Sequence, residues 1–230
     1  MTEYIHVIKS KSKKKYAFVL LSANRPKIRG YRGNVSLFQC DRDNLLIDLQ
    51  IKAIKESYPY ADIFLVTGYD ANSVISYVSS KFSFVKILEN LEYADTSSIH
   101  SFRMAVNVIG EDTNVFAIHG DRLFNKKAIS VDAKNASKVY SHKQEKISEK
   151  IGICYQSSVL KNMSYGLPSI WSEIVYFAQP DYKKLKPLVN RLKSLSIYSM
   201  CDLINYSINA NLVSYNVDSA SSVQIQEIGD

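Results

Sequence analysis

The sequence predicts an α/β fold in which a mostly parallel central sheet is flanked by helices. Apolar runs of strand length alternate with segments of helical periodicity over the first half of the chain. These runs are continuous rather than alternating, which is typical of strands that are covered on both faces. The length of 230 residues suits one large domain, and we treat residues 1–230 as such.

Four strands are predicted in the first half, at residues 16–22, 62–67, 84–88 and 114–119. Helices are predicted between them, at residues 44–57, 71–81 and 97–108. The first helix follows Asp43, which is a candidate N-cap. Strands joined by such crossover helices predict a parallel, doubly wound sheet.

Beyond Asp121 the pattern is weaker. Short strands are predicted at 151–155 and 212–217, and helices at 170–177, 182–195 and 200–210. The polar residues at about 141–150 are predicted to form an exposed loop. We expect this half to add mixed strands and a helical cover to the sheet.

Composition narrows the class of protein. The chain is 46% hydrophobic and 22% charged, as folded soluble proteins are. It has no apolar stretch of the roughly 18–20 residues that a membrane span needs and no signal sequence, so we expect a cytoplasmic protein without a membrane partner. The three cysteines are widely spaced without a CxxC motif, which argues against a disulfide framework and a zinc site.

The net charge of +7 comes largely from two basic clusters. Residues 1–15 form a basic N-terminal segment, which we interpret as solvated rather than as an arm for nucleic acid. The second cluster follows the first strand, where a phosphate site could form. It consists of Arg25, Lys27, Arg29 and Arg32.

Polar segments follow each of the four predicted strands. In an open parallel sheet, ligands bind outside the carboxyl ends of the strands, so these segments are the candidate binding residues. They are Leu21-Ser22-Ala23-Asn24-Arg25, Thr67-Gly68-Tyr69, Asn90 to Ser101, and Gly120-Asp121.

In this order, the segments resemble those of the nucleotidyltransferases that join a nucleoside triphosphate to a sugar phosphate or to phosphocholine, especially the bacterial choline-phosphate cytidylyltransferase type. That family shows Leu-Ala-Ala-Gly-x-Gly-x-Arg after strand one, Val-Thr-Gly-Tyr after the next, Asn-x-x-Tyr-x-x-Thr-Asn-x-x-Ser after the third, and Gly-Asp after the fourth. The resemblance covers about residues 16–124, and more faintly the rest. It implies a Rossmann-like, GT-A-type fold.

The resemblance also implies a Mg²⁺ site. Tyr215-Asn216-Val217-Asp218 is similar to the closing Tyr-Glu-Ile-Asp of the family, in which two carboxylates hold Mg²⁺. Asp121 and Asp218 are therefore the implied ligands, which requires the strand at 212–217 to run near that at 114–119. In an alternative alignment, the closing segment of the family matches residues 223–226, which contain no carboxylate. A hard cation would bridge the triphosphate and the attacking phosphate, which otherwise repel each other.

The resemblance also implies roles for the other candidates. Lys27 and Arg29, which flank the position of the family's arginine, would be catalytic, by neutralising the phosphates. The nucleotide would be bound by Leu21, Ser22, Ala23, Asn24, Arg25, Gly68 and Tyr69. The phosphorylated acceptor would be bound by Asn90, Tyr93, Thr96, Ser101 and Trp171.

The loop after the first strand departs from the family pattern. Its two glycine positions hold Asn24 and Pro26, and proline removes an N–H donor that could approach a phosphate. The arginine position holds Ile28. Either neighbouring basic residues supply the missing charge or triphosphate binding has been lost.

The predicted function is Mg²⁺-dependent transfer of a nucleoside monophosphate from a triphosphate to a phosphorylated small molecule, with release of pyrophosphate. One alternative is a non-catalytic protein of this fold that serves as a binding or assembly module, which Asn24 and Pro26 favour. A second is a nucleotide-sugar glycosyltransferase. For that class we would expect an Asp-x-Asp pair where this chain has Asp121-Arg122-Leu123.

Overall fold

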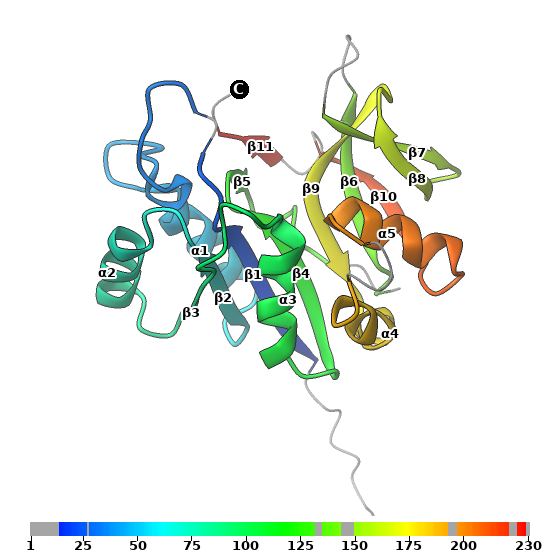
Figure 1. Cartoon of the computed structure of the whole chain (residues 1–230), viewed down its shortest axis with the longest axis horizontal. Coiled ribbons are helices and arrows are strands. Elements are labelled where there is room, and N and C mark those ends of the chain that lie inside the picture. Colours follow the sequence, from blue (N-terminus) through cyan, green and yellow to red (C-terminus); the bar gives the residue numbers. More distant parts are fainter. Residues whose placement is uncertain are drawn as a thin grey trace, which may run out of the picture.

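A computed structural model describes residues 14–26, 28–131, 135–143, 150–192, 197–220 and 225–228. Its main feature is a nine-stranded sheet with the order β3-β2-β1-β4-β9-β6-β10-β8-β7 (Figure 1). The strands are β1 (Lys15–Ser22), β2 (Asp62–Thr67), β3 (Lys86–Glu89), β4 (Thr113–His119), β6 (Lys138–Lys143), β7 (Ile151–Gln156), β8 (Val159–Tyr165), β9 (Ser169–Phe177) and β10 (Asn216–Ser219).

The first half of the chain forms the predicted parallel unit. β1 pairs in parallel with β2 on one side and with β4 on the other, and β2 pairs in parallel with β3. The predicted crossover helices are present as α1 (Leu46–Ser57), α2 (Ala71–Lys81) and α3 (Ser98–Val108). The cap of α1 differs from the prediction, because Leu45 is the N-cap residue and its N–H donates to Asp48.

The second half makes the sheet mixed, so the prediction of a mostly parallel sheet is wrong as a description of the whole. β9 is antiparallel to both β4 and β6, and β7, β8 and β10 also form antiparallel pairs. Because β7 pairs with β9 as well as with β8, the five strands β9, β6, β10, β8 and β7 close into a small barrel.

The helix predicted at 170–177 is instead strand β9. This segment joins the parallel unit to the barrel, and most of its residues are buried on both faces of the sheet. Its Ile170, Trp171, Val175 and Tyr176 are β-branched or aromatic, which suits a central strand. A continuous apolar run of this length does not distinguish a helix from a strand by its periodicity, and here the sheet environment decides.

The strand predicted at 212–217 begins only at Asn216. The N–H groups of Leu212 and Val213 donate to the carbonyl of Ser207, within the turn that ends α5 (Met200–Asn209). β10 lies between β6 and β8, so β9 and β6 separate it from β4. The predicted proximity of this strand to β4 is therefore wrong. The predicted loop at 141–150 also changes, because β6 extends to Lys143 and residues 144–149 lie outside the described residues.

A hydrophobic core lies on each face of the sheet. Helices α3, α4 (Gln179–Val189) and α5 cover one face, where Phe102, Tyr182 and Leu203 are buried (Figure 1). Helices α1 and α2 contribute to the core on the other face, where Phe18 and Phe116 stack with ring centroids 4.7 Å apart. This double burial explains the continuous apolar runs in the sequence.

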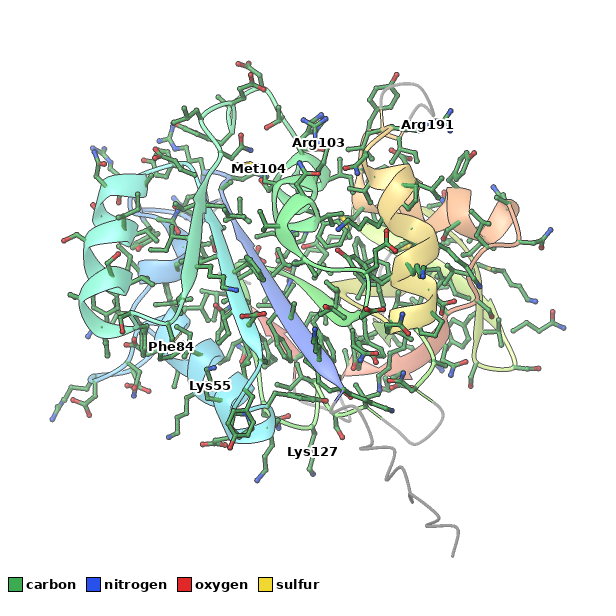
Figure 2. All side chains as sticks on the ribbon, turned by 90° about the horizontal axis from the view of Figure 1, so that it is seen from below. Lys55, Phe84, Arg103, Met104, Lys127 and Arg191 are labelled. Atoms are coloured by element: carbon green, nitrogen blue, oxygen red, sulfur yellow. The ribbon has the colours of Figure 1, made fainter. Side chains whose placement is uncertain are left out.

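A lysine and an aromatic ring pack together at the surface. Lys55 Nζ lies 4.6 Å from the ring centroid of Phe84, and Figure 2 places both side chains together at the edge of the molecule.

None of the helices within the described residues is long and apolar enough to span a membrane. Most of the predicted basic N-terminal segment lies outside the described residues, and β1 begins at Lys15.

Candidate functional site

A cavity of about 490 Å³ lies at the carboxyl ends of β1 and β4. This is the edge at which ligands bind in open α/β sheets. The polar and charged residues among those that line it are Ser22, Asn24, Arg25, Ser98, His119, Asp121, Arg122, Lys150, Tyr165, Trp171, Glu173 and Glu227. The parallel unit and the barrel therefore both contribute walls.

The loop after β1 is held by side chains rather than by glycines. Asn34, which is fully buried, donates from Nδ2 to the carbonyl oxygens of Ser22 and Tyr69, at 2.9 and 2.7 Å. Ser36 donates to Ser22 Oγ at 2.7 Å, and the Tyr69 hydroxyl donates to the carbonyl of Arg32. These contacts fix both ends of the loop against the sheet.

Two glycines let backbone segments meet at this edge. A Cβ on Gly120 would lie 1.9 Å from Ser22 Oγ, and a Cβ on Gly68 would lie 2.9 Å from the carbonyl oxygens of Ala23 and Asn90. No larger residue fits at either position without a shift of the backbone. The Gly-Asp and Gly-Tyr pairs therefore bring the ends of β1, β2 and β4 together.

An arginine lies at the centre of a cluster of acids beside the cavity. Arg122, at the start of β5 (Arg122–Phe124), contacts Asp121, Glu173 and Glu227 through its guanidinium. The Nε to Asp121 Oδ1 distance is 3.3 Å, and Nη1 lies 2.5 Å from Glu227 Oε2. Lys150 Nζ donates to the same Glu227 oxygen at 2.9 Å. We call these five residues, together with His119, the acidic cluster.

Two structural features position the acidic cluster. Gln50 on α1 is fully buried and donates from Nε2 to the carbonyl oxygens of Gly120 and Arg122, at 3.1 and 2.8 Å. Glu173 adopts a left-handed backbone conformation with φ of 55° in the middle of β9. Such a conformation is strained for a residue other than glycine, and strain of this kind gathers at functional sites.

His119 and Glu173 form an ion pair at the wall of the cavity. His119 Nδ1 lies 3.0 Å from Glu173 Oε2. Burial lowers the pKa of His119, but the carboxylates of Glu173 and Asp121 together outweigh it, so that the net shift is upward. Burial raises the pKa of Glu173, and His119 and Arg122 together bring it well below its usual range. The ion pair therefore favours the charged form of both side chains.

Asp121 lies at the wall of the cavity, next to Arg122. Its Oδ1 accepts no hydrogen bond from any residue that the structure describes, although Arg122 Nε is near. Single donor atoms of His119, Asp121 and Glu173 lie within 4.8 Å of one another. Burial raises the pKa of Asp121, against the smaller effects of Arg122 and His119. Glu173 is already paired with two basic groups, which leaves Asp121 as the candidate metal ligand of these three.

Asp218 does not line the cavity. Its carboxylate accepts a hydrogen bond from Lys138 Nζ at 3.1 Å, and the same ammonium donates to the carbonyl of Ser130. Asp218 lies in β10, where it pairs in register with Tyr140 of β6. Two strands, β9 and β6, separate β10 from β4. The acid from the C-terminal segment that reaches the acidic cluster is Glu227, because β11 (Ile225–Glu227) pairs with β5. The described residues thus give Asp218 a lysine partner and not a shared site with Asp121.

The predicted acceptor residues after β3 bind one another. Asn90 Nδ2 donates to Thr96 Oγ1 and to Ser101 Oγ, and Asn90 Oδ1 accepts from the N–H of Glu92. Tyr93 packs edge-on against Tyr69, with ring centroids 6.2 Å apart. None of these four predicted residues is among those that line the cavity. In the free protein they organise the loop that leads into α3.

The remaining predicted residues divide by position. Trp171 lines the cavity, and its indole N–H donates to the carbonyl of Ile174 at 3.2 Å, so it both packs and forms a wall. Leu21, Ser22, Asn24 and Arg25 also line the cavity. Ala23, Gly68 and Tyr69 support the loop from behind, since Tyr69 N–H donates to Ala23 O. Arg29 is exposed and does not line the cavity, and Lys27 lies outside the described residues.

Several cluster residues were not singled out as site residues from the sequence. Arg122 stands directly after Gly120-Asp121, and a charged residue beside the candidate metal ligand is a signal in the sequence. Glu173 is a single acid within an otherwise apolar strand, which is also a signal, but the segment had been predicted as a helix. Glu227 and Lys150 carry no signal, because only the folded chain brings them to β5 and the cavity.

Several solved structures with the same fold are nucleotidyl-transferring enzymes by name. The CTP:phosphocholine cytidylyltransferase from Streptococcus pneumoniae aligns over 95% of both chains with a TM-score of 0.74 and 16% identity. The chain has the fold of the nucleotidyltransferases. An inositol-1-phosphate CTP transferase from T. maritima aligns over 94% of this chain and 90% of its own, at a TM-score of 0.70 and 15% identity.

The nucleotidyltransferase fold extends over nearly the whole chain. A nucleoside-diphosphate-sugar pyrophosphorylase from Vibrio cholerae aligns over 92% of this chain and 95% of its own, at a TM-score of 0.68 and 9% identity. No protein-family model matches the chain, and no curated protein matches it in sequence. The resemblance predicted from the ordered segments is thus confirmed at the level of the fold.

Proposed function

We propose that the protein transfers a nucleoside monophosphate from a nucleoside triphosphate to a phosphorylated small molecule, a sugar 1-phosphate or phosphocholine, with release of pyrophosphate. The observation that carries the proposal is the cavity at the carboxyl ends of β1 and β4, with Asp121 on its wall. An oxygen of the acceptor phosphate would attack the α-phosphate, the bond to pyrophosphate would break, and no covalent intermediate with the protein is needed.

The walls of the cavity suit anionic substrates. Arg25 and Lys150 line it, and so does Ser98, the first residue of the eleven-residue helix α3. The N-terminus of a helix carries partial positive charge and free N–H groups, which favour phosphate. The catalytic role that we propose for Arg29, and for Lys27, which lies outside the described residues, is to neutralise charge on the phosphates.

Asp121 would hold a Mg²⁺ ion together with the phosphates. Mg²⁺ is commonly bound by one or two carboxylates plus substrate phosphates, and Asp121 Oδ1 is available for this purpose. The ion would neutralise the charge that develops between the attacking and leaving oxygens. Trp171 would form the wall of the acceptor pocket, and Ser22, Asn24 and Arg25 would contact the nucleotide.

A second candidate function is a non-catalytic binding module that keeps this fold. The loop after β1 favours it, because Pro26 lines the cavity and offers no N–H group to a phosphate. Under this interpretation a phosphorylated ligand would bind without being converted.

The decisive experiment is a pyrophosphate-release assay. Each of the four nucleoside triphosphates is combined with a panel of sugar 1-phosphates and phosphocholine in the presence of Mg²⁺. We expect release with one combination, loss of at least about a hundredfold in Asp121→Asn, and less than about a threefold change in Asp218→Asn. Binding of the substrates without any release would favour the non-catalytic module.

A further inference from the structure

The centre of the acidic cluster is a fixed positive charge. The Arg122 side chain is 6% exposed and contacts three carboxylates, those of Asp121, Glu173 and Glu227. A guanidinium stays protonated in proteins and offers five N–H donors in a planar fork. It can therefore serve several acids at once, as a metal ion would.

Permanently charged basic groups already occupy the space between the carboxylates of the acidic cluster. The Arg122 guanidinium contacts all three carboxylates, and the Lys150 ammonium also contacts Glu227. A divalent cation that entered the free protein would have to displace the buried guanidinium or add two positive charges beside it. Both are unfavourable, because like charges repel each other and the freed guanidinium would lose its partners.

We infer that Arg122 takes the place of a divalent cation in the free protein, so that the protein alone binds no metal and the cation enters only together with the phosphates of a nucleotide. The first half of this inference stands on the acidic cluster alone, whereas the second half rests on the proposed function. Nucleotide phosphates would bring the negative charge that compensates the added cation, and they would complete its oxygen ligands around Asp121 Oδ1.

The test is a titration of metal-free protein with Mn²⁺, read by the electron paramagnetic resonance of free Mn²⁺ and by the melting temperature. Wild-type protein should bind no Mn²⁺ at millimolar concentration. Arg122→Gln leaves the carboxylates without their guanidinium, so it should bind Mn²⁺ at least about tenfold more tightly, a difference of about 1.4 kcal/mol. Asp121→Asn in the Arg122→Gln background should remove that gain.

Two variants control for charge and for folding. Arg122→Lys keeps the positive charge in a different shape, so it should bind Mn²⁺ no better than wild type. Circular dichroism shows whether each variant is folded. If Arg122→Gln does not fold, the double variant Arg122→Gln, Glu227→Gln replaces it, because it removes one carboxylate together with the guanidinium and should show the same gain.

Two results would overturn the first half of the inference. One is Mn²⁺ binding by wild-type protein alone that Asp121→Asn abolishes, and the other is an Arg122 variant that folds without gaining affinity. A second arm adds a non-hydrolysable nucleoside triphosphate, with which wild type should take up Mn²⁺. If the first arm succeeds and no nucleotide brings Mn²⁺ into the protein, the second half fails and the role of Arg122 in the free protein stands. The pyrophosphate-release assay then decides separately whether the proposed function holds.

Discussion

Asp121 and Asp218 were both predicted as metal ligands, and both contact a basic side chain, yet their surroundings differ. Asp121 shares a buried arginine with two other acids at the wall of the cavity, whereas Asp218 has the single ammonium of Lys138 and a side chain that is 43% exposed. β9 and β6 separate their strands. The position of a strand in the sheet, rather than the motif that it carries, decides which acid can meet a ligand.

Removing the two basic partners should give the largest contrast. Arg122→Met leaves three carboxylates without their shared cation, and breaking a buried ion pair costs about 3–5 kcal/mol. Lys138→Met keeps the apolar stem and leaves the half-exposed Asp218 to water, so it should cost at most about 1 kcal/mol. Urea unfolding measures both changes. Equal losses would mean that the two acids have equivalent surroundings.

A second contrast compares two glycines, one where β1 and β4 approach each other closely and one in open space. Gly120→Ala places a Cβ against Ser22 Oγ and Leu21 O, so we expect a loss of about 1–3 kcal/mol from overpacking. Gly110→Ala is the matched control, because a Cβ there meets nothing within 4 Å. Its free energy of unfolding should change by less than about 0.5 kcal/mol. A tolerated Gly120→Ala would show that the ends of β1 and β4 are not in close contact.

A smaller effect should appear in the pH dependence of stability. The pKa of His119 lies above its unfolded value of 6.5, because Glu173 and Asp121 together outweigh the opposing effect of burial. The stabilisation from this pair is therefore full below about pH 6.5 and is lost as the pH rises through the folded pKa. In metal-free buffer, the difference in unfolding free energy between wild type and His119→Asn should shrink over that range. Glu173→Gln should show the same trend, and a difference independent of pH would contradict the ion pair.

The parallel half of the fold could be predicted from the sequence because its signals are local. Residues 16–22, 62–67 and 114–119 are continuous apolar runs between amphipathic helices, and each lies within a parallel strand of the structure. The residues at the strand ends follow from the same topology. Leu21, Ser22 and Asp121 meet at one cavity because parallel strands end at one edge.

The barrel and the acidic cluster could not be predicted, because both depend on pairings between distant segments. Residues 170–177 are apolar enough for a helix or a strand, and only the barrel selects the strand. Glu227 reaches Arg122 through the pairing of β11 with β5, about a hundred residues earlier in the chain, and no periodicity encodes that pairing. The motif around Asp218 matched the family in sequence, while the register of β10 directs that acid to Lys138.

The most direct test of the central claim is a crystal structure with a non-hydrolysable nucleoside triphosphate and Mn²⁺, in which anomalous scattering locates the metal. We predict a Mn²⁺ peak bonded to a carboxylate oxygen of Asp121 and to phosphate oxygens in the cavity at the ends of β1 and β4, with Asp218 still bonded to Lys138. A peak bonded to Asp218 would contradict the account. So would a nucleotide bound outside this cavity.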